Sequence, residues 1–153
     1  REWLDSKDVA LPGLVVENGA GLSRSARISA RHLGAVLLAA NDSLFMPELV
    51  ASMPVAAMDG TLRGRFERDD VAGRLHMKTG SLDDVSALAG FVTARSGRRY
   101  AAVVMVNAPD AHRGPGEELQ EALVGWVLAR EPGDPPAGDC AVAAGTGVAA
   151  VPR

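Results

Sequence analysis

The chain has 153 residues and a formal net charge of −3, and 47% of its residues are hydrophobic and 23% charged. These values are typical of one soluble globular domain with a hydrophobic core. The lysines and arginines are scattered, which excludes the basic patch of a nucleic-acid-binding protein and a polybasic membrane anchor. The one cysteine, Cys140, excludes an internal disulfide, and no apolar stretch is long enough to span a bilayer.

The N-terminal part of the chain predicts short elements joined by turns. Residues 1–22 indicate the end of a helix, a Pro-Gly turn, a short strand over 14–16 and a glycine-rich turn. Ser29 is a favourable N-cap, and the apolar residues after it recur at the spacing of an amphipathic helix. Pro47 is tolerated at a first helical position and predicts a second, shorter helix that ends near Ser52.

The middle part predicts an antiparallel sheet. Residues 75–79 alternate between apolar and polar side chains, as a strand does, and residues 85–93 and 100–106 indicate two further strands. Because the turns between them are short, the three strands are expected to form a meander. Apolar residues at helical spacing over 119–127, Trp126 among them, predict a helix that lies across this sheet.

The composition changes after Arg130, where proline, glycine and alanine dominate. Such a segment lacks the large apolar residues whose burial offsets the entropy cost of ordering, so we expect it to be disordered. The sequence therefore predicts one domain over residues 1–130 and a disordered tail over residues 131–153.

The tetrapeptide Lys78-Thr79-Gly80-Ser81 carries the clearest chemical signal. A lysine ammonium can hold a carboxylate or bias a neighbouring proton transfer, and a threonine hydroxyl beside it can donate to the same carboxylate. A glycine lets backbone and substrate approach closely, and an edge strand offers unpaired groups to an extended peptide. The triplet alone favours an exposed strand lysine before a turn, but the strand, hairpin and helix around it favour a site.

Three segments in the right order resemble the class C low-molecular-mass penicillin-binding proteins, which are D-Ala-D-Ala carboxypeptidases and endopeptidases. Residues 76–91 (HMKTGSLDDVSALAGF) resemble the third-motif region of that family. Residues 17–24 (ENGAGLSR) resemble the approach to its second motif, and residues 52–62 (SMPVAAMDGTL) resemble the loop between the two. The resemblance covers roughly residues 10–130 and implies an α/β (α+β) fold, with a transpeptidase/β-lactamase-like antiparallel sheet flanked by helices.

The resemblance implies a role for each matching residue. Ser23 would be the serine of the second motif, which passes a proton towards the leaving group, and Lys78 would supply positive potential to that relay. Thr79 would bind the terminal carboxylate of a D-Ala-D-Ala stem peptide, and Gly80 would allow close approach. The backbone N–H of Ser81 would form half of an oxyanion hole. Ser25 stands at the motif's third position, where the family has asparagine, and would contact the substrate amide.

The nucleophile motif of the family, Ser-x-x-Lys, does not occur in the chain. Lys7 and Lys78 are the only lysines, and the residue three positions before each is a leucine. We therefore expect the nucleophile to belong to an N-terminal half of the same protein that is missing here. The chain alone is accordingly expected to be inactive.

The family's first strands are also expected to be missing, and they normally pair with the last strand of the meander. We therefore expect the strand around Val103 to Val106 to have an unpaired apolar edge and the chain to associate or dissolve poorly.

The resemblance also implies where the parent enzyme works and what it binds. It would be exported to the periplasm, act on peptidoglycan stem peptides through an acyl-enzyme and bind β-lactam antibiotics, without a metal or organic cofactor. His32, His76 and His112 are too dispersed for a metal-ligand motif. Two alternatives stay open: a non-catalytic module that binds stem peptide, and a fragment of a related β-lactamase or serine esterase.

Overall fold

A five-stranded antiparallel sheet organises the chain in the computed structural model, which describes residues 2–66, 71–134, 141–143 and 146–151. Side chains are described over residues 2–66 and 71–134. The strand order is β1-β2-β3-β5-β4, so the first three strands form the predicted meander. The strands are β1 (Leu75–Leu82), β2 (Val85–Thr93), β3 (Arg99–Asn107), β4 (Ala141–Ala143) and β5 (Thr146–Val151).

The α-helices are α1 (Glu2–Asp5), α2 (Ala30–Asn41), α3 (Met46–Ala51) and α4 (Pro115–Leu128), with short 3-10 turns η1 (Gly60–Leu62) and η2 (Ala111–Arg113). The predicted cap of α2 is confirmed, because the hydroxyl of Ser29 accepts the His32 N–H at 3.1 Å. The predicted helix at Pro47 is also confirmed and begins one residue earlier, at Met46.

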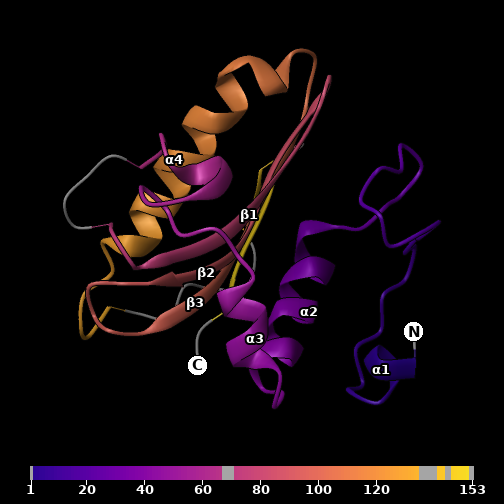
Figure 1. Cartoon of the computed structure of the whole chain (residues 1–153), viewed down its shortest axis with the longest axis horizontal. Helices are drawn as coiled ribbons and strands as arrows, with labels where there is room; N and C mark the ends of the chain where they lie inside the picture. The colour runs from indigo at the N-terminus through magenta and orange to yellow at the C-terminus, as the bar shows by residue number, and fades with distance from the viewer. Residues whose placement is uncertain (1, 67–70, 135–140, 144–145, 152–153) are drawn as a thin grey trace.

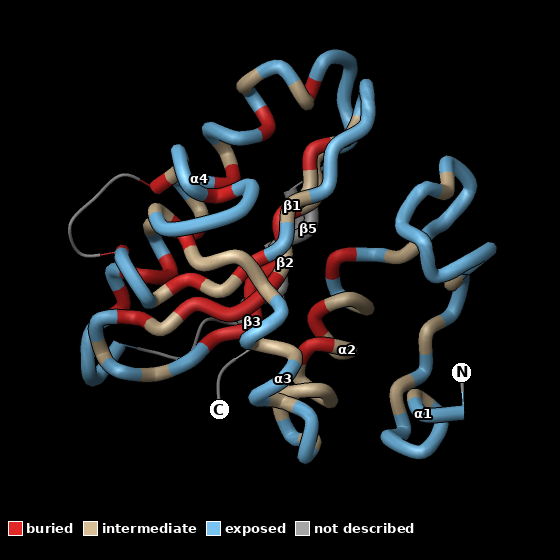
Figure 2. Tube along the Cα trace, viewed as in Figure 1, coloured by how far each residue is buried: buried red, intermediate tan, exposed pale blue. Residues whose placement is uncertain are grey.

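The helices cover the two faces of the sheet separately, so the fold has three layers (Figure 1). One core cluster lies between the sheet and α4, and it includes Leu75, Met77 and Leu88 from the strands. The other lies between the opposite face and α2, and it includes Phe91 and Val103. Figure 2 shows the buried residues concentrated along the strands and on the inner sides of these helices. The antiparallel sheet flanked by helices agrees with the predicted fold class.

The buried face of α4 differs from the predicted one. Trp126 was placed on the apolar stripe, but its side chain is half exposed and the guanidinium of Arg130 lies 5.1 Å from its ring centroid. The buried stripe instead includes Gly116 and the fully buried Gln120. A glycine and a glutamine are not apolar residues, so a prediction from hydrophobic spacing alone placed the buried face on the wrong side of the helix.

β4 and β5 both lie within residues 131–153, the segment whose composition predicts disorder. β5 pairs with β3 from Ala101 to Val106, and β4 pairs with β5. The edge around Val103 to Val106 is therefore paired, and the expectation of a bare apolar edge there is wrong. Small residues do not bury much surface, but their backbones can complete a sheet ladder.

The N-terminal segment lies beyond α2, on the side away from the sheet (Figure 1). The strand predicted over residues 14–16 is reduced to a single bridge between Val15 and Arg27, which exchange backbone hydrogen bonds of 3.0 Å. Among the described residues, no helix is long and apolar enough to cross a membrane.

Candidate functional site

The loop over residues 54–62 covers the first half of the outer edge of β1. The Ala56 N–H donates to the Leu75 carbonyl at 3.1 Å, and the Met77 N–H donates to the Pro54 carbonyl at 3.0 Å. The Asp59 carboxylate accepts the Val55 N–H at 2.7 Å, which closes the loop on itself. These bonds hold the loop beside Leu75, His76 and Met77, where Val55 forms an isolated bridge with His76.

Beyond Met77, no backbone group of the described residues pairs with the outer edge of β1. In an extended strand the N–H and C=O of alternate residues point to the same side, so Leu75 and Met77 show that the odd-numbered residues face outward. Thr79 and Ser81 continue this series, whereas Lys78 and Gly80 face β2. The backbone groups of Thr79 and Ser81 therefore point to the side where neither β2 nor the loop pairs with them.

The side chains of the tetrapeptide alternate between the two faces of the sheet. Lys78 lies opposite Ala89, which packs in the cluster beneath α2, so Lys78 is on the α2 side. Thr79 lies opposite Leu88, which packs in the cluster beneath α4. Lys78 and Thr79 can therefore meet one ligand only at the edge of β1, where both side chains are within reach. The Lys78 ammonium already turns to this edge and donates to the Thr79 carbonyl at 2.8 Å.

The loop also adds a hydroxyl to the edge of β1. The hydroxyl of Thr79 donates to that of Thr61 at 2.9 Å. Thr61 lies in η1, immediately after the Asp59-Gly60 turn. Gly60 has φ +52, in the left-handed region that favours glycine. The loop thus both closes part of the edge and brings a second threonine to its open part.

Ser23 is fixed within its own loop. Its hydroxyl donates to the Glu17 carboxylate and accepts the N–H groups of Ser25 at 3.1 Å and Ala26 at 2.9 Å. The Ser25 hydroxyl lies 3.3 Å from that of Ser23. The hydrogen bond from Ser23, with a smaller one from Ser25, lowers the pKa of the exposed Glu17. Ser23 and Ser25 are therefore brought together, with a charged partner.

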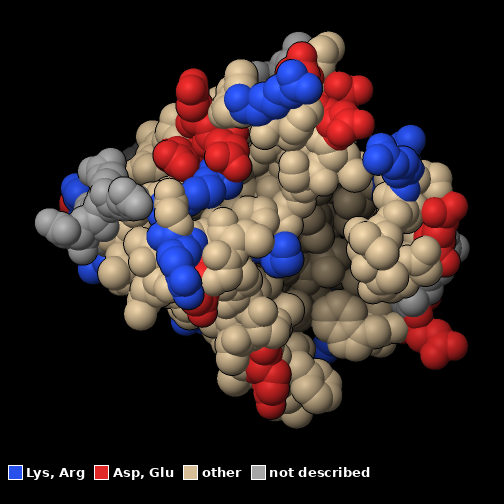
Figure 3. All heavy atoms as spheres, turned by 45° about the horizontal axis from the view of Figure 1, so that its top comes forward, with Lys and Arg blue, Asp and Glu red and all other residues tan. Residues whose placement is uncertain are grey.

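The two parts of the predicted site are not joined to each other. In the part of the chain that the structure describes, no hydrogen bond links Ser23 or Ser25 to Lys78, Thr79 or Ser81. The surface is hollowed between the larger body and the N-terminal part, and acidic and basic side chains are interspersed around it (Figure 3).

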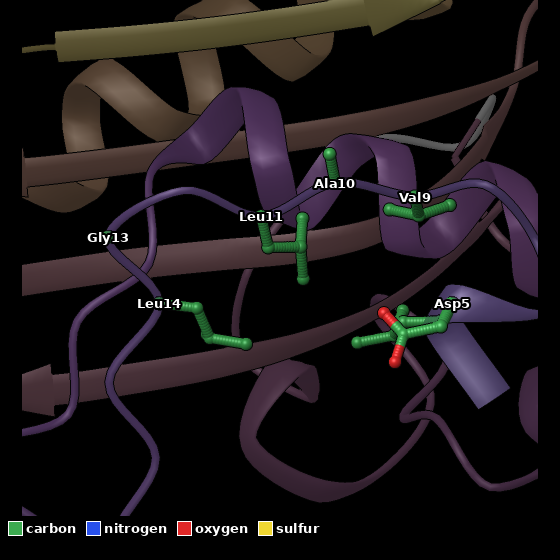
Figure 4. A pocket seen from close by; sticks show the side chains of 7 residues that line it. Asp5, Val9, Ala10, Leu11, Gly13 and Leu14 are labelled. Carbon is green, nitrogen blue, oxygen red and sulfur yellow. The ribbon is translucent and has the colours of Figure 1, made fainter. Parts of the chain in front are cut away.

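A separate pocket of about 290 Å³ lies within residues 4–14 and includes none of the predicted site residues. The side chains of Asp5, Leu11 and Leu14 are among those that line it (Figure 4).

Sequence reasoning missed Glu17 as a partner of Ser23. Glu17 was only the first letter of a glycine-rich segment, and the fold of residues 17–23 brings it back to Ser23. It also missed Thr61, because nothing local to residues 52–62 showed that this segment packs on β1. No group of three or more His, Cys, Asp or Glu side chains able to hold a metal occurs among the described residues.

Comparison with known proteins identifies the family. The family model described as D-Ala-D-Ala carboxypeptidase 3 (S13) matches residues 1–129. The D-alanyl-D-alanine carboxypeptidase of an Actinomadura species is 34% identical over 128 residues, which are 80% of this chain and 23% of that protein. Carboxypeptidase DacB of Mycolicibacterium smegmatis is 39% identical over 101 residues, which are 62% of this chain and 22% of that protein. The chain thus spans about a quarter of the length of these relatives.

The fold has solved counterparts. The crystal structure of penicillin-binding protein 4 (dacB) from Haemophilus influenzae matches with a TM-score of 0.73 and 26% sequence identity, over 83% of this chain and 30% of that chain. A second structure of that protein, complexed with a β-lactam, matches equally well, at a TM-score of 0.73. These matches confirm the transpeptidase-like architecture predicted for the sheet and its helices.

Proposed function

Because the chain belongs to the D-Ala-D-Ala carboxypeptidase 3 (S13) family, we propose that its residues form the substrate-holding side of a serine D-Ala-D-Ala carboxypeptidase. The observation that carries the proposal is the open half of the β1 edge, with the outward backbone groups of Thr79 and Ser81 and the ammonium of Lys78. A peptide that ends in D-Ala-D-Ala would add to this edge as a further strand.

The open edge offers a hydrogen-bonding or charged partner for each polar group of such a peptide. The outward N–H and C=O of Thr79 and Ser81 would pair with the peptide backbone. The Lys78 ammonium has three donors, so it can keep the Thr79 carbonyl and still bind a carboxylate. The outward N–H of Ser81 would stabilise the oxyanion that forms when the scissile carbonyl is attacked, a contribution of about 3–4 kcal/mol for such a donor.

Ser23 would act from the other side of the substrate, as the proton carrier of the second motif. Its hydroxyl donates a hydrogen bond to the Glu17 carboxylate. The relay would therefore require the hydroxyl to turn away from Glu17, or the proton to pass through the Glu17 carboxylate. Ser25 would contact the substrate amide in place of an asparagine, with one hydroxyl instead of an amide's paired donor and acceptor.

The nucleophile would come from residues outside this chain, because no Ser-x-x-Lys occurs in its 153 residues. We therefore propose that the chain binds stem peptide and does not form an acyl-enzyme by itself. The whole enzyme would work on peptidoglycan outside the cytoplasmic membrane and be acylated by β-lactams, as the β-lactam complex of the Haemophilus influenzae relative supports.

A titration of the isotope-labelled chain with N-acetyl-D-Ala-D-Ala tests this proposal by NMR. We expect the amide signals of Thr79 and Ser81 to shift with the D,D-peptide and not with its L,L counterpart. Lys78→Gln should weaken binding by about tenfold, because a charge-assisted hydrogen bond is lost. Lys7→Gln is the matched control, since Lys7 is the other lysine of the chain and is exposed in the N-terminal segment.

Incubation of the chain with penicillin tests the second half of the proposal. The intact mass should stay unchanged, because no activated serine is present. A stoichiometric penicilloyl adduct would contradict the proposed dependence on an external nucleophile. Absence of any D,D-specific shift along β1 would contradict the peptide-binding role itself.

A further inference from the structure

We propose that Asn18 is a site of spontaneous deamidation, in which its side-chain amide is lost through a cyclic imide formed with the nitrogen of Gly19. The proposal is independent of the proposed function. It rests on the Asn18-Gly19 pair in the exposed turn before Ser23 and on the way the chain folds there. The reaction needs the backbone nitrogen of the following residue to reach the side-chain carbonyl carbon, and the folded-back side chain of Asn18 favours this approach.

The side chain of Asn18 is folded back over the next peptide unit. Its Oδ1 accepts the Ala20 N–H at 2.9 Å, which closes an Asx turn around the Gly19 peptide group. This turn keeps the Asn18 side chain beside the Gly19 peptide group, whose nitrogen would attack. The hydrogen bond to Oδ1 also draws electron density from that carbon and makes it more open to nucleophilic attack.

Gly19 is available as the attacking group. Its N–H donates no hydrogen bond to any described residue, and an added Cβ would meet nothing within 4 Å. Because glycine has no side chain, its nitrogen approaches the carbonyl carbon without steric hindrance. Both residues are exposed, so solvent can remove the amide proton and reach the product.

The chemistry is balanced with water as the only co-reactant. The Gly19 nitrogen loses its proton to solvent and forms a bond to the side-chain carbon of Asn18, and the bond from that carbon to Nδ2 breaks with release of ammonia. One water molecule then opens the five-membered imide. Opening at one carbonyl gives aspartate, and opening at the other gives isoaspartate, which places an extra methylene in the main chain.

The two other asparagines of the chain are protected by their backbone. Asn41 ends α2, and the N–H of the following Asp42 donates to the Leu38 carbonyl at 3.1 Å. Asn107 ends β3, and the N–H of the following Ala108 donates to the Asp84 carbonyl at 3.1 Å. In both cases the N–H that would have to attack is already hydrogen-bonded, and its residue carries a side chain that hinders the approach. They are internal controls for the exposed turn.

The modification would change the loop that fixes Ser23. Aspartate at position 18 adds a negative charge next to Glu17, whose carboxylate accepts the Ser23 hydroxyl. A like charge disfavours the ionised form of Glu17, so its pKa would rise from its lowered position. Isoaspartate would in addition lengthen the main chain between Glu17 and Ser23 and move the two residues apart.

Incubation of the folded chain at mildly alkaline pH, followed by peptide mapping with mass spectrometry, tests the proposal. We expect Asn18 to lose its amide at least about tenfold faster than Asn41 or Asn107, which corresponds to about 1.4 kcal/mol of activation free energy. The variant Gly19→Ala should slow the reaction at Asn18 by a similar factor. It is a matched variant because the added Cβ meets no atom within 4 Å.

The same incubation in urea separates backbone protection from sequence. Unfolding should accelerate the reaction at Asn41 and Asn107, because it frees the nitrogens that follow them, and should slow it at Asn18, because it breaks the Asx turn. Equal rates at the three asparagines of the folded chain would overturn the proposal. So would an Asn18 that stays intact in the folded chain while it reacts in urea.

Discussion

The two parts of the candidate site are built in different ways. The β1 edge is held by contacts between segments far apart in the sequence: the loop around Pro54 pairs with it on one side, and β2 pairs with it on the other. The Ser23 loop is held almost wholly by residues next to it, from Glu17 to Ala26. The first is part of the three-layer core, whereas the second lies in the N-terminal segment beyond α2 (Figure 1).

This difference shows which part of the site the chain can form by itself. The chain can form the edge of β1 by itself, because the elements that position β1 (the loop, β2 and α4) all belong to the chain. The Ser23 loop has an internal geometry, but no described hydrogen bond fixes it against β1. The proposed peptide binding along β1 and the proposed proton transfer by Ser23 are therefore expected to respond differently to changes in the core.

Gly90→Ala should produce the largest loss of stability, because the backbone of β1 lies directly against Gly90 of β2. A Cβ on Gly90 would lie 2.2 Å from the His76 carbonyl oxygen and 2.6 Å from the Met77 Cα. Relief of these backbone clashes must shift β1, so we expect the free energy of unfolding to fall by about 3 kcal/mol or more in urea titrations. Gly80→Ala is the control, since its Cβ would meet only Ala87 at 3.6 Å and should cost little. Equal stabilities would show that β1 is not fixed by this contact.

The second largest loss of stability is expected from a substitution in the buried polar network between β2 and α4. Gln120 is fully buried, donates to the Ser86 hydroxyl at 2.8 Å and accepts from Arg65 at 3.0 Å. Gln120→Leu should lower the free energy of unfolding by about 1–3 kcal/mol, because the polar partners lose a hydrogen bond inside the protein. The double variant Gln120→Leu/Ser86→Ala should cost less than the sum of the two single variants. Strict additivity would contradict the bond between them.

Removal of the C-terminal tail should change association more than stability. A chain that ends after Asp134 lacks β5 and leaves the apolar edge of β3 from Ala101 to Val106 unpaired. We expect this shorter chain to form dimers or larger species in light scattering as its concentration rises, and the 153-residue chain to remain monomeric at the same concentrations. A shorter chain that stays monomeric would count against β5 as the cover of that edge.

The smallest effect is expected at Glu17 and concerns pH. Its lowered pKa means that the carboxylate stays ionised, and keeps the Ser23 hydroxyl, until the pH falls through that lowered value. Ser23→Ala should raise the pKa of Glu17 towards its ordinary value, and Ser25→Ala should raise it less, because the bond from Ser23 is the main cause. Carbon NMR titration of the Glu17 carboxylate measures both. An unchanged pKa in Ser23→Ala would show that the loop is open in solution.

The sequence predicted those parts of the fold that depend on local pattern. Strand alternation and short turns identified the meander of β1, β2 and β3, and Ser29 identified the start of α2. It did not predict what depends on contacts between distant segments. The pairing of Pro54 and Ala56 with β1 and the cover of β3 by β5 involve backbone groups, which leave no mark on residue type.

The same distinction applies to the candidate site. Lys78 and Ser81 were found because the motif is contiguous, and their place on a strand agrees with the prediction. Their roles stay predictions. The alternation of Lys78 and Thr79 between the two faces and the bond from Ser23 to Glu17 were visible only in three dimensions.

Amide hydrogen exchange along β1 measures whether its outer edge is closed up to Met77 and open at Thr79 and Ser81. We expect slow exchange at Met77, whose N–H is bound to Pro54, and at Lys78 and Gly80, which face β2. Fast exchange is expected at Thr79 and Ser81. Protection of Thr79 and Ser81 equal to that of Met77 would mean that the edge is already occupied, and would rule out the proposed addition of a peptide strand there.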